Sequence, residues 1–310
     1  MHIRRAATAT LATLTLFAAT SCASDDLADD GGDSGDKGAV TISGQSFPEA
    51  TLVASMYEQL LADAGYDPTV KLVDTRDVYM KIFPGDVDIV PEYVGGIVDF
   101  LNTTENGADA EALTTSDAEE SIEAAESLLD DKLITLLDPS EATDTNAFFV
   151  TKEYSESEGV TKLSDLKGKT ITLAAAPDCE ERVDCAKGLT DTYGVKIKEV
   201  LKLGFASDQT YQSVLDGESQ LGLTSTTDGT LDSQGLVLLD DDQQIQTAQN
   251  LVPAVSSDFL ADNEEVEDLL DELMGKLTTE NLTELNGQVA VDRKKPEDVA
   301  KEFLESQGLL

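Results

Sequence analysis

An arginine between two cysteines is the most chemically suggestive pattern in the second half of the chain. Five residues separate Cys179 from Cys185, a spacing that permits a small disulfide loop with Arg182 inside it. Two free thiols are the alternative. Arginine offers a planar, bidentate cation suited to a carboxylate, or it pairs with an acidic neighbour in the same loop. Two sulfurs without a histidine make a poor metal site, so we expect no metal and no cofactor.

Histidine content and charge exclude several functional classes. The only histidine is His2, in the N-terminal leader, so the processed chain lacks Ser-His-Asp and Cys-His nucleophiles and histidine metal sites. The chain has 62 acidic and 21 basic residues and a formal charge of −41, which argues against nucleic-acid binding. Acidity attracts cationic solutes, although a soluble surface suited to salty surroundings explains most of these carboxylates. A small extracytoplasmic enzyme remains an alternative, but no activated nucleophile or paired-acid motif stands out.

The N-terminus has the pattern of an export signal. Arg4 and Arg5 precede an uncharged stretch rich in Ala, Thr and Leu, which is shorter than the roughly 20 apolar residues of a membrane-spanning helix. The sequence ATSC at 19–22 resembles the lipobox of bacterial lipoproteins, with Ala where Leu is usual. We expect a signal peptide over 1–21 and a lipid on Cys22, with an ordinary secretory signal as the alternative. Export favours the disulfide over free thiols.

Composition then separates a linker from a folded part. Residues 22–39 are acidic and glycine-rich with almost no bulky apolar side chain, which predicts a flexible, lipid-anchored linker. From Val40 onward, strand-like apolar runs alternate with amphipathic helical stretches, which indicates an α/β fold. The expected strands are 40–44, 70–74, 88–93, 146–151, 170–175, 221–224, 236–239 and 251–255. The expected helices are 48–64, 75–83, 95–101, 117–132, 208–215, 266–277, 279–285 and 296–307.

Two segments, 77–93 and 209–225, share one layout. In each, a helical tyrosine precedes a glycine by six positions, an acidic residue follows the glycine, and an apolar strand comes next. The strand's end delivers a side chain to the crevice at the carboxyl edge of a sheet. The repeat predicts two similar lobes that face one cleft.

Several motifs occur in one order along the chain. They are ISGQSFPE at 42–49, GDVDIVPEY at 85–93, SDLKG at 164–168, the Cys179–Cys185 loop, TTDG at 226–229, LTTENLTEL at 277–285 and DVAKEF at 298–303. Together they resemble the substrate-binding proteins of ABC importers for glycine betaine, choline and related quaternary ammonium osmoprotectants. The resemblance implies a two-lobed, periplasmic-binding-protein-like α/β fold of type II with two hinge crossings. Lobe 1 would comprise 40–142 and 252–310, and lobe 2 would comprise 143–251.

The resemblance also implies which residues bind the solute. Tyr93 and Tyr211 match cage tyrosines, whose faces hold a trimethylammonium group. Arg182 matches an arginine that binds the acid of the ligand. Gln45 and Thr227 are weaker candidates for polar contacts. Ordinary half-buried core tyrosine is the alternative for both cage positions.

Three positions depart from the family pattern. Asn146 and Ser225 stand where we align further cage tyrosines, and Gly96 replaces a small hydroxyl residue. Either Phe47, Phe148 or another aromatic residue completes the cage, or the solute is not a simple betaine. Asn146 and Ser225 would then offer hydrogen bonds to a bulkier or more polar solute.

The function implied is that of a lipid-anchored, monomeric, non-enzymatic protein on the extracytoplasmic face of the cell membrane. It would capture glycine betaine, choline, carnitine or a related betaine, and deliver this cationic or zwitterionic solute to an ABC permease and its ATPase. Contact with the membrane would be through the lipid alone. A non-betaine polar or aromatic solute, and a sensing module without transport, are the alternatives.

Overall fold

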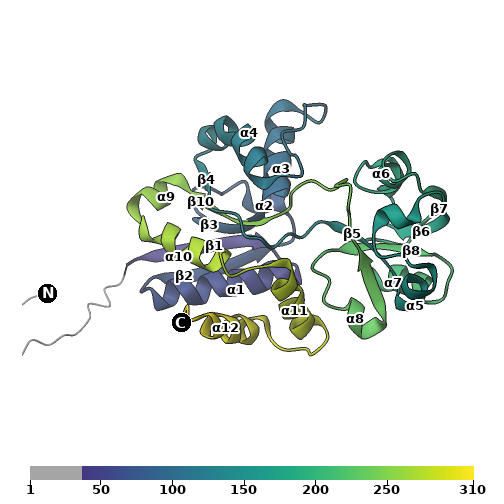
Figure 1. Cartoon of the computed structure of the whole chain (residues 1–310). Coiled ribbons are helices and arrows are strands. Elements are labelled where there is room, and N and C mark those ends of the chain that lie inside the picture. The colour runs from purple at the N-terminus through teal and green to yellow at the C-terminus, as the bar shows by residue number, and fades with distance from the viewer. Residues whose placement is uncertain (1–36) are drawn as a thin grey trace, which may run out of the picture. The chain divides into compact units, whose positions relative to one another are not determined.

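The structure, a computed structural model, describes residues 37–310 (Figure 1). The predicted signal peptide, Cys22 and most of the predicted linker lie outside the described residues. No helix within 37–310 is long and apolar enough to cross a membrane.

The first of two five-stranded sheets has the order β2-β1-β3-β10-β4. β1 is parallel to β2 and β3, whereas β10 is antiparallel to β3 and β4. The carboxyl ends of three parallel strands therefore meet at one edge, where α/β proteins bind ligands. The strands are β1 (Ala39–Gln45), β2 (Asp67–Val73), β3 (Ile89–Tyr93), β4 (Ile134–Leu136) and β10 (Leu251–Ser256).

Helices cover both faces of the first sheet, and each face has its own apolar core. Figure 1 shows α1 and α12 on one side of this sheet and α3 and α4 on the other. Alternation along β3 places Ile89 and Tyr93 in one core and Val90 in the other. The helices are α1 (Pro48–Asp63), α2 (Arg76–Tyr79), α3 (Val94–Asn106), α4 (Ala118–Asp131), α9 (Ser257–Asp262), α10 (Glu265–Met274), α11 (Thr279–Ala290) and α12 (Pro296–Gln307).

The second sheet has the order β7-β6-β8-β5-β9 and a separate core. β6 is parallel to β7 and β8, and β5 is antiparallel to β8 and β9. Its strands are β5 (Asn146–Thr151), β6 (Thr170–Ala175), β7 (Lys196–Lys202), β8 (Leu221–Ser225) and β9 (Leu236–Leu239). Its helices are α5 (Lys152–Glu158), α6 (Ala186–Asp191), α7 (Asp208–Leu215) and α8 (Leu231–Gln234), with 3-10 turns at Leu163–Leu166 and Cys179–Glu181.

The chain passes from the first sheet to the second after β4 and returns just before β10. The two crossing segments lie side by side, because Thr143 and Asn250 form an antiparallel bridge. The Asp144 N–H donates to the Gln249 carbonyl at 3.0 Å, and the Leu251 N–H donates to the Ala142 carbonyl at 2.9 Å. Two α/β sheets joined by two crossings confirm the predicted fold class.

Candidate functional site

Tyr93 and Glu49 meet at the carboxyl edge of the first sheet. Tyr93 ends β3 and is 9% exposed. Its hydroxyl donates to Glu49 Oε1 at 2.5 Å, and its ring stacks on Phe47 with centroids 6.2 Å apart. Pro48 starts α1, so Phe47 lies at the helix N-cap and Glu49 in the first turn. Burial, followed by the negative charge of Glu49, raises the pKa of Tyr93 well above its ordinary value, so the phenol stays a neutral donor.

A second carboxylate, that of Asp144, lies close to Glu49 on the first crossing segment. Thr227 donates its hydroxyl to Asp144 Oδ1 at 3.0 Å. Burial, and then the charge of Glu49, raises the pKa of Asp144 to about 7. No ion pair within 37–310 involves either carboxylate. Glu49 and Asp144 therefore form an acidic site that no lysine or arginine of residues 37–310 neutralises.

Asn286 on α11 connects this acidic pair to the second sheet. Its Nδ2 donates to Glu49 Oε2 at 2.5 Å and to the Thr227 carbonyl at 3.0 Å. Its Oδ1 is buried and has no hydrogen-bond partner among the described residues. Hydrogen-bond acceptors therefore outnumber donors beside Tyr93.

Tyr211 on α7 lies in a separate network at the end of β8. Its hydroxyl donates to Asp228 Oδ2 at 2.6 Å, and Thr224 donates to the same oxygen at 2.6 Å. Its ring packs on Phe149, with centroids 5.3 Å apart. The ring contacts of residues 37–310 thus pair Tyr93 with Phe47 and Tyr211 with Phe149, and do not join the two tyrosines.

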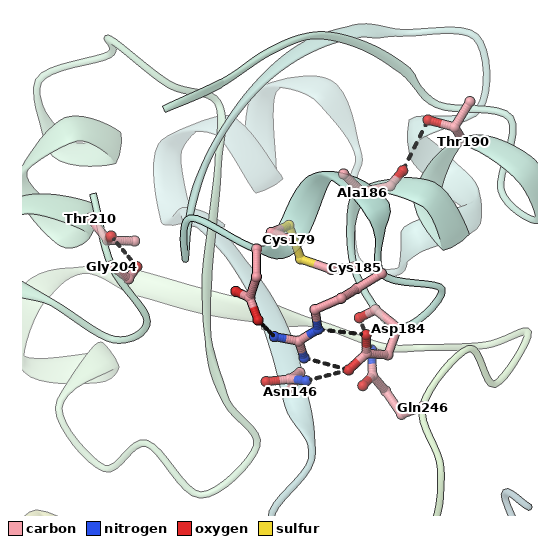
Figure 2. Close-up of a disulfide and its surroundings, with 11 residues drawn as sticks. Asn146, Cys179, Asp184, Cys185, Ala186, Thr190, Gly204, Thr210 and Gln246 are labelled. Atoms are coloured by element: carbon pink, nitrogen blue, oxygen red, sulfur yellow. Dashed lines mark hydrogen bonds and ion pairs between the residues drawn. A yellow bond between two sulfur atoms is a disulfide. The ribbon is translucent and has the colours of Figure 1, made fainter. Parts of the chain in front are cut away.

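The disulfide loop holds Arg182 against acidic neighbours, and Figure 2 shows the disulfide with Asp184 and Asn146 beside it. Cys179 and Cys185 form the predicted disulfide. Arg182 donates to both carboxylate oxygens of Asp184, from Nε at 2.9 Å and from Nη2 at 2.5 Å. Its Nη1 contacts Asp178 Oδ2 at 3.4 Å. All three nitrogens of the guanidinium therefore contact carboxylates in this loop or directly before it.

Polar residues take the two positions where cage tyrosines were aligned. Asn146 and Ser225 are partners in the antiparallel register of β5 and β8. The Asn146 amide donates to Asp184 Oδ2 at 2.8 Å, so that it shares an acceptor with the arginine of the loop. The Ser225 hydroxyl lies 3.4 Å from the Thr227 hydroxyl.

Two other sequence candidates differ in their accessibility. Gln45 ends β1 and is half-buried, at the same sheet edge as Tyr93. Phe148 is 1% exposed, belongs to the core of the second sheet, and lines a cavity together with Asn146.

The structure adds residues that sequence reasoning missed. Glu49 was quoted only as part of a motif, although a buried acid in a helix's first turn is an unusual feature. Gln249, on the second crossing segment, accepts from the Gly96 N–H at 3.0 Å. Arg76 donates twice to Glu92, from Nε and Nη2, at 2.8 Å each. Since α1, α2 and the crossing segments are distant in sequence, only the fold brings these groups to one edge.

Comparison with known proteins fits this geometry. Residues 38–306 match the family described as the substrate binding domain of ABC-type glycine betaine transport systems. The chain is 27% identical over 273 residues to the glycine betaine-binding protein YehZ of Escherichia coli K12, covering 84% of this chain and 88% of that protein. It is 23% identical over 281 residues to the carnitine transport binding protein OpuCC of Listeria monocytogenes, covering 88% of each.

Solved structures show the same fold. The ligand-free structure of YehZ from Escherichia coli superposes with a TM-score of 0.72 at 24% identity, covering 87% of this chain and 99% of that one. The match in sequence extends over both sheets and both crossings. The chain therefore belongs to the family of substrate-binding domains of ABC-type glycine betaine transport systems, extracytoplasmic proteins that bind a solute for an importer and carry out no catalysis.

Proposed function

We propose that this protein captures a quaternary ammonium solute, such as glycine betaine, choline, carnitine or a related betaine, and delivers it to an ABC permease. The single observation that carries the proposal is Tyr93, stacked on Phe47 and hydrogen-bonded to Glu49 at the carboxyl edge of the first sheet. A trimethylammonium group has no N–H and a diffuse charge, so aromatic faces and nearby carboxylates bind it best. Asp144 adds a second carboxylate to the same place.

We infer that the two lobes close on this solute. Lobe 1 comprises 40–142 with 252–310 and lobe 2 comprises 143–251, with the paired crossings as the hinge. The separate sheet and core of each lobe support this division. Crossing segments bend most readily where few core contacts hold them.

Closure would bring the lobe 2 candidates toward Tyr93. The wall that lobe 2 contributes would be lined by Tyr211, Asn146, Ser225 and Thr227. Gln45 would lie on the wall that lobe 1 contributes. Arg182 could contact the ligand only by giving up its bidentate hydrogen bonds to Asp184, a pair whose side-chain exposures are 32% and 28%.

The anchor belongs to the same proposal. Removal of a signal peptide at 1–21 would leave a lipid on Cys22, and the acidic linker 22–39 would tether a monomeric protein near its permease. The composition of these residues supports the assignment. Mass spectrometry of the protein purified from membranes tests it, because an unmodified Cys22 would contradict the lipid.

The solute is tested by titration with a panel of quaternary ammonium compounds, followed by calorimetry and melting temperature. A true ligand raises the melting temperature by mass action on the folded state. Tyr93→Ala should weaken binding at least about tenfold, while Tyr93→Phe keeps the aromatic face and most of the affinity. Tyr154→Ala, on α5 away from the sheet edge, is the matched control. Absence of both heat and a melting shift across the panel would refute the proposal.

A further inference from the structure

A second arginine, Arg76, is fixed at the same edge of the first sheet as Tyr93. It starts α2, directly after β2, and donates to both oxygens of Glu92. Glu92 is 2% exposed and also accepts the Tyr79 hydroxyl. The Tyr93 N–H donates at 3.1 Å to Glu92 Oε2, the oxygen that Arg76 Nη2 also contacts. The guanidinium is therefore held within two hydrogen bonds of the Tyr93 backbone.

Gly96 makes room for this guanidinium. It lies in the first turn of α3, three residues after Tyr93. A Cβ at this position would lie 2.6 Å from Arg76 Nη2 and 3.3 Å from Arg76 Cζ. The small hydroxyl residue expected here would displace the arginine. The glycine at position 96, where the family pattern has a small hydroxyl residue, therefore allows Arg76 to occupy its position.

Arg76 retains hydrogen-bonding capacity that Arg182 lacks. A guanidinium has five N–H donors, and Glu92 takes those of Nε and one of Nη2. A hydrogen bond between Arg76 and the Tyr79 hydroxyl accompanies these contacts. No carboxylate of residues 37–310 pairs with Nη1, and the side chain is 22% exposed. In Arg182, by contrast, all three nitrogens already contact Asp184 or Asp178.

We propose that Arg76 binds the carboxylate of a zwitterionic solute whose ammonium group lies against Tyr93. The proposal rests on the function proposed above and names the residue that sets specificity within it. Glu92 holds the guanidinium in one orientation, Gly96 leaves it accessible, and Nη1 supplies the charge-assisted hydrogen bonds. Glu49 and Asp144 attract the positive end of the solute and Arg76 the negative end. The competing interpretation is an ion pair that only fastens α2 to β3.

Matched solutes separate these interpretations. Glycine betaine and choline share the trimethylammonium group, but only glycine betaine carries a carboxylate. The test is calorimetric titration of both into the wild type and into Arg76→Gln combined with Glu92→Gln, a double variant that leaves no buried charge unpaired. Glycine betaine should bind about 10- to 100-fold more weakly to this variant, and choline less than about threefold. Lys132→Gln with Glu105→Gln, an exposed pair of the same lobe, is the control.

Glu92→Gln alone provides an opposite test. It removes the internal partner of Arg76, so glycine betaine should bind more tightly while choline does not. Equal losses for the two solutes in the double variant, or loss of carboxylate discrimination in Arg182→Gln alone, would overturn the assignment of Arg76. If the wild type binds no member of the quaternary ammonium panel, the proposed function fails. If it binds choline but not glycine betaine, only the assignment of Arg76 fails.

Discussion

Replacing Asp144 by asparagine should stabilise the protein at alkaline pH. In the folded chain, burial and the neighbouring Glu49 raise the pKa of Asp144 from 3.8 to about 7. The folded state therefore binds this proton more tightly than the unfolded state does. The resulting stabilisation is complete below pH 3.8 and is lost as the pH rises through about 7. An asparagine amide would keep an acceptor for the Thr227 hydroxyl without carrying a charge.

The size of the effect follows from the same pKa. Each unit corresponds to about 1.4 kcal/mol, so the loss between pH 5 and pH 8 would be about 3 kcal/mol for a group cut off from water. Asp144 is half-buried, and water screens part of that energy. We therefore expect the stability advantage of Asp144→Asn over the wild type to grow by about 1 to 2 kcal/mol from pH 5 to pH 8.

Urea unfolding at the two pH values, followed by circular dichroism, measures this difference directly. Comparing variant with wild type at each pH cancels the titration of all other groups. Asp131→Asn, an exposed acid at the end of α4, controls for the change in net charge. An advantage that stays constant or shrinks with pH would show that Asp144 is already ionised at pH 5, and would refute the argument.

Binding of a cationic solute should also release a proton from Asp144, because the positive charge lowers the pKa of this carboxyl. The affinity of the protein for the solute should therefore rise between pH 6 and pH 8. Calorimetry in buffers of different ionisation heat measures the proton release. A pH-independent affinity would contradict this. Gly229→Ala should destabilise the protein by about 1 to 3 kcal/mol, because its Cβ would lie 2.3 Å from the Gly287 backbone nitrogen. Gly275→Ala, whose nearest contact is 3.4 Å, is the control, and equal effects would contradict the steric argument. Reduction of the disulfide should lower the free energy of unfolding by about 2 kcal/mol, as expected for a short loop; unchanged urea unfolding in reductant would refute it.

The sequence predicted eight of the ten strands and missed β4 and β7, which are edge strands of the two sheets. β3, β5, β6 and β8 are apolar runs that end near the expected residues. β7 was missed because lysines and a glutamate interrupt its apolar residues, a pattern typical of an edge strand. The helix expected over 75–83 is shorter in the structure, where α2 spans Arg76–Tyr79 and turns occupy 80–86.

The candidate site was predictable only where a strand end identifies it. Tyr93 could be placed because it follows an apolar strand directly. The acidic pair could not, because Glu49 and Asp144 meet only when the crossing segment passes α1, and no local pattern encodes that contact. Arg76 could not be predicted for a similar reason, because it contacts Gly96, which lies on a different helix and 20 positions later in the sequence.

The antiparallel bridge between Thr143 and Asn250 has an evolutionary consequence. The chain enters and leaves the second sheet at adjacent points, and all five strands of that sheet lie in the segment between them. Segments whose ends lie together are the ones that tolerate insertion and exchange. Recombination between relatives at this one junction would replace the wall that the second sheet gives the proposed site, while Tyr93, Glu49 and Arg76 stay in place. Ligand preference could then change without changes in the first sheet.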